Sequence, residues 1–141
     1  MKTVIFDTNV LLDLFVFNDF RAIHLKQALI ENHIVGLATP KTLDEFADVM
    51  SRPLFSLDSA TQENILSQWR SLAKVLPDTF LTPAPWQCQD PDDQVFVDLA
   101  FTSRPCILMS KDNEILKLSS RAKKELVIIT DNYTIEKPFN E

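Results

Sequence analysis

The sequence predicts an α/β fold in which helices cover both faces of a parallel β-sheet. Short apolar runs alternate with segments of helical periodicity along the 141 residues. The apolar runs are continuous and do not alternate with polar residues, which is typical of strands buried on both faces. The connections are short, which favours parallel strands joined by right-handed crossovers. We expect one domain, residues 1–141, because a chain of this length buries roughly two-thirds of its unfolded surface.

Five apolar runs are the expected strands. They are TVIF (3–6), IVGLA (34–38), TFLT (79–82), CILM (106–109) and LVII (126–129). The third run is the weakest of the five. We expect these runs to form the sheet.

Segments of helical periodicity fill the gaps between the runs. They are a helix entered at Val10, residues 19–32, residues 40–50, residues 60–76 and a helix that starts near Pro91. The segment 40–50 has Thr39 as its expected cap and Pro40 in its first turn. In the segment 60–76, apolar residues recur with the spacing of one helix face. Residues 83–91, PAPWQCQDP, contain three prolines and no periodicity, so we expect a loop that joins the two halves.

The composition excludes several kinds of site. Gly36 is the only glycine, so neither the Walker phosphate loop nor the dinucleotide-binding fingerprint is present. Cys88 and Cys106 have no CxxC partner and no paired histidine nearby, which argues against a zinc site and a disulfide framework. No apolar run approaches the roughly 18 residues of a membrane span, and the N-terminus lacks the layout of a secretory signal. We therefore expect a cytoplasmic protein with no membrane partner.

The net charge of −6 argues at first against a polyanionic partner. Divalent cations bound to a group of carboxylates would, however, cancel part of this charge. Basic residues gather late in the chain, where they form either a solvated helix face or a surface that contacts phosphates. They are Lys111, Lys117, Arg121, Lys123 and Lys124.

Three aspartates fall where a ligand site of a parallel sheet is expected. Asp7 directly follows the first apolar run, Asp112 follows the fourth, and Asp93 lies in the first turn of the helix near Pro91. Ligands of open parallel sheets bind at the carboxyl ends of the strands. Each aspartate also has a local explanation: Asp7, Thr8 or Asn9 suits the N-cap of the helix that follows, Asp112 suits a second N-cap, and Asp93 suits the positive end of a helix dipole. Three acids at one edge repel one another without a cation, so together they favour a metal site.

Glu45 lies in the segment 40–50, in which Leu43, Phe46 and Met50 form the apolar stripe. On a helical wheel Glu45 lies on roughly the opposite side, so the periodicity favours a solvated glutamate. By periodicity alone, Asp44 is an equally good candidate for a fourth acid of the site. The helix therefore does not select a fourth acid by itself.

Four motifs together resemble those of PIN-domain ribonucleases, specifically the toxin-like PIN proteins of prokaryotic toxin–antitoxin systems. In chain order they are VIFDTNVLLD, TLDEFADVMSRP, DPDDQVFVDLA and ILMSKDNEIL. Each motif is loose alone, but their order and spacing over nearly the full length make the set specific. The resemblance implies a three-layer α/β/α sandwich around a central parallel sheet.

The resemblance also implies which residues form the site. Asp7, Glu45, Asp93 and Asp112 would be the catalytic acidic quartet, and for Glu45 this implication replaces the helical-wheel interpretation. Glu114 stands where the family often has a further acid, and it would join Asp7, Asp93 and Asp112 as a metal ligand. The supporting polar residues would be Thr8, Asn9 and Ser110.

The implied chemistry is metal-dependent hydrolysis of RNA that leaves a 5′-phosphate and a 3′-hydroxyl. Carboxylate oxygens suit Mg²⁺ or Mn²⁺, which activate a water for in-line attack on phosphorus. Lys111 and Lys117 are the expected RNA contacts because they follow the strand that delivers Asp112. The other expected partners are a cognate antitoxin protein and a second copy of the chain, which the aromatic-rich segment LFVFNDF would contact to form a homodimer.

Two other interpretations stay open. A haloacid-dehalogenase-like phosphatase also has an acid after its first strand, but its chemistry needs the pattern D-x-D, and position 9 is Asn. A PIN fold without catalysis would serve as a binding module. The presence of all four acids argues against this second alternative.

Overall fold

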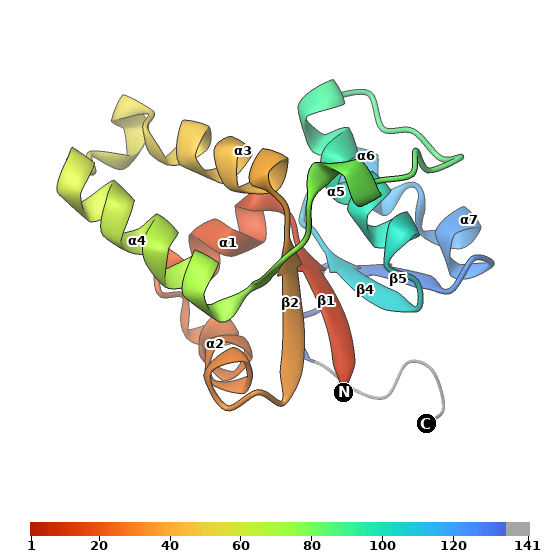
Figure 1. The fold of residues 1–141 in the computed structure, drawn as a ribbon, viewed down its shortest axis with the longest axis horizontal. Helices are drawn as coiled ribbons and strands as arrows, with labels where there is room; N and C mark the ends of the chain where they lie inside the picture. The colour runs from red at the N-terminus through yellow and green to blue at the C-terminus, as the bar shows by residue number, and fades with distance from the viewer. Residues whose placement is uncertain (135–141) are drawn as a thin grey trace.

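A five-stranded parallel sheet forms the centre of the fold in the computed structural model, which describes residues 1–134 (Figure 1). The strands are β1 (Lys2–Phe6), β2 (Ile34–Ala38), β3 (Lys74–Val75), β4 (Cys106–Met109) and β5 (Val127–Thr130). They lie in the order β3-β2-β1-β4-β5, and every neighbouring pair is parallel. The predicted parallel sheet is confirmed, with the first strand at its centre.

Helices cover both faces of the sheet. The α-helices are α1 (Thr8–Phe15), α2 (Ile23–Ile30), α3 (Pro40–Met50), α4 (Ser59–Leu72), α5 (Pro91–Thr102), α6 (Asn113–Leu116) and α7 (Ser119–Lys123). Short 3-10 turns are formed by Phe20–Ala22, Pro53–Phe55 and Asp78–Phe80. In Figure 1, α1 to α4 lie on one side of the sheet and α5 to α7 on the other. This arrangement is the expected three-layer α/β/α sandwich.

The side chains of the central strand alternate between the two helical layers. Val4 and Phe6 pack with α1 to α4, whereas Ile5 packs with α5 to α7. All three are at most 1% exposed. The run is continuously apolar because the strand is buried on both faces.

The predicted strand at 79–82 is wrong. Asp78–Phe80 form a 3-10 turn in which Phe80 is exposed, and the third strand is Lys74–Val75. Periodicity assigns these two residues to the helix 60–76, but α4 ends at Leu72. Both side chains of β3 are exposed at the edge of the sheet, so no apolar run marks this strand.

The helices α3 and α5 each begin directly after a polar residue whose side chain caps them. Thr39 caps α3 through a reciprocal pair of hydrogen bonds with Thr42, and Pro40 is the first helical residue, as the sequence predicts. Asp90 caps α5 by accepting a hydrogen bond from the Asp92 N–H at 2.9 Å. Within residues 1–134, no helix has the length and apolarity that a membrane crossing requires.

The carboxyl ends of β1 and β4 bring two connections together. Phe6 pairs in register with Met109, and the Asp7 N–H donates to the Met109 carbonyl at 2.9 Å. The residue that follows β1 therefore lies beside Ser110, the residue that follows β4. This edge of the sheet carries the candidate site.

Candidate metal centre

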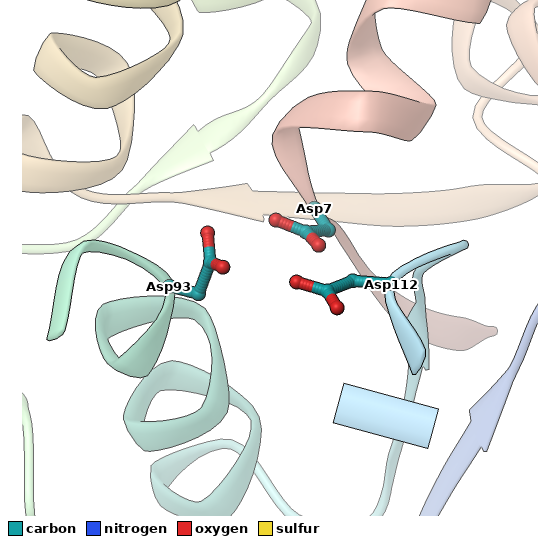
Figure 2. A group of neighbouring side chains, drawn as sticks. All are labelled: Asp7, Asp93 and Asp112. Carbon is teal, nitrogen blue, oxygen red and sulfur yellow. The ribbon is translucent and has the colours of Figure 1, made fainter. Parts of the chain in front are cut away.

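Three carboxylates converge at the carboxyl edge of the sheet. Asp7, Asp93 and Asp112 each offer one oxygen, and these three oxygens lie within 4.8 Å of one another. Figure 2 shows the three side chains pointing toward one another from the end of β1, the first turn of α5 and the segment after β4. The sequence prediction that these three aspartates gather at one edge thus agrees with the geometry.

Asp7 is the innermost member of the group and is only 2% exposed. One carboxylate oxygen accepts the Thr8 N–H at 2.8 Å, so Asp7 does cap α1. The other accepts the Ser110 hydroxyl at 2.7 Å and the Asn9 side-chain amide at 3.2 Å. Burial raises the pKa of Asp7, and these three hydrogen bonds oppose that rise, while the charge of Asp112 adds to it.

Asp112 is held by one hydrogen bond of its backbone N–H and one of its carboxylate. Its N–H donates to the Ser110 hydroxyl at 3.0 Å, and its carboxylate accepts the Glu114 N–H at 2.9 Å as the cap of α6. Asp112 thus both caps α6 and offers a carboxylate oxygen to the acidic group. The local explanations for Asp7 and Asp112 do not compete with a metal site.

Asp93 lies in the first turn of α5 and is half-buried. Desolvation raises its pKa to about 7, and the charge of Asp7 is the next cause. Burial and the neighbouring carboxylates therefore both oppose ionisation of Asp93. A divalent cation at this point would offset the repulsion from these carboxylates and favour the ionised form of Asp93.

Glu45 does not belong to this close group. It is half-buried on α3 and faces the start of α5, where desolvation and the charge of Asp92 raise its pKa. It lines a groove with Lys41, Pro91 and Asp92. Of the expected quartet, the structure thus brings three acids together and leaves the fourth on the neighbouring helix.

The other expected ligand, Glu114, pairs with Lys117, whose ammonium lies 2.7 Å from the Glu114 carboxylate. Of the expected supporting residues, Thr8 and Asn9 open α1 and Ser110 directly follows β4, and all three contact Asp7. Asn9 accepts the Lys111 N–H at 3.1 Å while its amide donates to Asp7, so the network fixes the orientation of the amide. An amide donor at position 9 is the opposite of the carboxylate that a haloacid-dehalogenase-like site requires.

The residues present fit a hard divalent cation. Three carboxylate oxygens supply ligands of the kind that Mg²⁺ and Mn²⁺ prefer, and they leave room for waters in the shell. The buried Thr8 hydroxyl, next to Asp7 in the chain, has no hydrogen-bond partner among residues 1–134. An orphaned buried hydroxyl beside crowded carboxylates indicates a site that is incomplete without a ligand or ordered water.

Two further acids have structural roles that the sequence does not predict. Asp13 is 3% exposed and accepts hydrogen bonds from Lys111 and Tyr133. A lone acid inside the apolar run VLLDLF is the signal that could have identified it. Asp98 accepts from the Ala84 N–H and from Gln94, both at 2.9 Å, and so ties the loop before α5 to that helix.

The comparisons with known proteins give one family. The PIN domain model matches residues 3–114, which run from β1 into α6 and include Asp7, Asp93 and Asp112. No curated protein shows significant similarity to the chain.

Proposed function

Because the chain belongs to the PIN domain family, whose members are generally metal-dependent nucleases, we propose that it is a metal-dependent ribonuclease that hydrolyses RNA phosphodiester bonds. The observation that carries this proposal is the convergence of Asp7, Asp93 and Asp112 within 4.8 Å. Of the alternatives, a non-catalytic PIN-fold binding module has no need for mutually repelling carboxylates that are buried or half-buried.

In the proposed reaction, Asp7, Asp93 and Asp112 would hold a Mg²⁺ or Mn²⁺ ion. Such an ion would supply Lewis-acid chemistry, lowering the pKa of a water and stabilising negative charge at phosphorus. Ser110 and Asn9 orient the Asp7 carboxylate by donating hydrogen bonds to it. Asp93 would bind such an ion in its ionised form, because a protonated carboxyl is a poor ligand. Glu45 and Glu114 would act at the margin of the site.

The biological role we propose is that of the toxin in a type II toxin–antitoxin pair, acting on cytoplasmic RNA. The support is the toxin-like character of the four sequence motifs. A cognate antitoxin or a second copy of the chain would cover exposed apolar side chains of α2, of the segment between α1 and α2, and of the turn that follows α3. These are Phe17, Phe20, Ile23, Ile30 and Leu54, each at least 50% exposed.

The test is cleavage of an unstructured RNA with Mg²⁺, Mn²⁺ or EDTA. We expect cleavage with either metal, none with EDTA, and loss of cleavage in Asp93→Asn and Asp112→Asn. Glu45→Gln should lose activity as well if the quartet acts as a unit, whereas its neighbour Asp44→Asn should not. Asp44 is a matched control because it is an exposed acid one residue away on the same helix.

Metal binding by itself separates the enzyme from the binding module. At a free Mn²⁺ concentration of about 100 times the dissociation constant, the free energy of unfolding should rise by about 2.7 kcal/mol. Absence of any stabilisation by Mn²⁺, together with no cleavage, would favour the module.

A further inference from the structure

A half-buried ion pair between Lys111 and Asp13 lies beside the metal centre, in which the Asp13 carboxylate is buried and the Lys111 side chain is 39% exposed. The Asp13 carboxylate, on α1, is 3% exposed and accepts the Lys111 ammonium at 2.7 Å and the Tyr133 hydroxyl at 2.5 Å. Arg21 approaches the same oxygen at 4.0 Å. A buried carboxylate without such partners would carry a large desolvation cost, so Asp13 holds Lys111 in place.

Lys111 belongs to the segment that carries Asp112. Its own N–H donates to the Asn9 side chain at 3.1 Å, and its ammonium reaches Asp13. Asn9 and Asp13 are four residues apart on α1 and therefore lie on the same helix face. The segment 110–112 is thus fastened to α1 at two points about one turn apart.

The residues on either side of Lys111 are members of the metal centre or its hydrogen-bond network. Ser110 donates to Asp7, and the Asp112 N–H donates to Ser110. The short helix α6 that follows has only four residues and offers little stiffness of its own. The position of the Asp112 carboxylate relative to Asp7 therefore depends on how the segment 110–112 is held.

We propose that Asp13 and Lys111 are positioning residues of the metal centre, whose ion pair, completed by Tyr133, holds Asp112 within reach of Asp7 and Asp93. This inference rests on the proposed metal-dependent function. It gives Lys111 a role other than the phosphate contact that the sequence suggests. The ammonium is already engaged by a buried partner, and freeing it for RNA would leave the Asp13 charge inadequately paired.

The sign of the effect on metal affinity tests the proposal. Removing a positive charge near a cation site should tighten cation binding if charge alone matters. A positioning role predicts the reverse, because a looser segment presents Asp112 less well. We expect Lys111→Met to weaken Mn²⁺ binding roughly tenfold, as is usual when a group that orients a metal ligand is lost.

The experiment is titration calorimetry of the metal-free full-length chain with Mn²⁺. Lys123→Met is the matched control, because it makes the same change of charge on α7 and should leave the dissociation constant unchanged. Lys111→Arg keeps the charge and hydrogen-bond donors and should restore most of the affinity. Tyr133→Phe alters no charge, removes one donor to Asp13 and should cause a smaller loss, which keeps the proposal testable if Lys111→Met does not fold.

The outcomes distinguish the inference from the proposed function. If wild type binds Mn²⁺ and Lys111→Met binds it equally well or more tightly, the positioning role is overturned. The proposed metal centre is then unaffected. Loss of RNA affinity in Ca²⁺ with unchanged Mn²⁺ affinity would overturn it in favour of a phosphate contact. A wild-type protein that binds no Mn²⁺ would overturn the proposed function and the inference with it.

Discussion

Asp93 is the member of the acidic group for which the surroundings raise the pKa into the neutral range. Desolvation, followed by the charge of Asp7, raises its pKa from the usual 3.8 to about 7. The folded metal-free protein therefore holds a proton at Asp93 more tightly than the unfolded chain does. This contribution to stability is fully present below about pH 4 and is lost as the pH rises through about 7.

Substitution of Asp93 by Asn should remove this pH dependence. In EDTA, wild type and Asp93→Asn should have the same free energy of unfolding near pH 4, and the variant should be the more stable protein above pH 7. Urea unfolding at several pH values measures the difference. Clear destabilisation of the metal-free variant at high pH would instead mean that α5 depends on a charged carboxylate in its first turn.

At the scale of single elements, β2 depends on having no side chain at Gly36. A Cβ built there would lie 2.9 Å from a methyl carbon of Leu29 and 2.9 Å from the Trp69 ring. The Leu29 methyl can move, but the Trp69 ring is confined by Phe6 and Phe15, with ring centroids 5.7 Å away in each case. The close approach of α2 and α4 to the sheet therefore requires glycine.

Gly36→Ala should destabilise the protein by about 1–3 kcal/mol, as is usual when a methyl group is forced into a packed core. Equilibrium urea unfolding gives the value. In a Leu29→Ala background the same substitution should cost less, because one of the two clashes is gone. Equal costs in both backgrounds would show that the strain does not involve Leu29.

At the scale of the whole molecule, a chain of net charge −6 has to bind a polyanion under the proposed function. Among the late basic residues, Lys117 lies on the segment that follows Asp112, and its side chain is 65% exposed. Its pairing with Glu114 is an exposed contact of small free energy, so the ammonium remains available to a phosphate. Lys123 and Lys124 lie farther along the chain, at the end of α7.

Lys117→Ala should weaken RNA binding regardless of RNA sequence and should reduce the dependence of log affinity on log salt by about one unit. Binding is measured in Ca²⁺ at several salt concentrations, since Ca²⁺ should fill the site without supporting cleavage. Lys123→Ala and Lys124→Ala are the controls and should change neither quantity. Unchanged affinity and slope in all three would direct the search to Arg21, Arg52 or a partner chain.

The sequence by itself determined the sandwich, four of the five strands and the gathering of Asp7, Asp93 and Asp112. These conclusions depend on local signals. Continuous apolar runs mark strands buried on both faces, and residues that directly follow parallel strands share one edge of the sheet. Asp7 and Asp112 are placed by the ends of β1 and β4, and α5 begins at the same edge, so no distant packing has to be known.

Only the tertiary structure decided the edge strand, the position of Glu45 and the partners of Asp13 and Asp98. Lys74–Val75 form a strand because β2 offers an unpaired edge, and their own exposed side chains carry no strand pattern. Asp13 meets Lys111 across 98 residues of sequence. Periodicity describes which face of an element is apolar, but contacts between elements so far apart in the chain depend on how the helices pack, and packing is settled by the whole core at once.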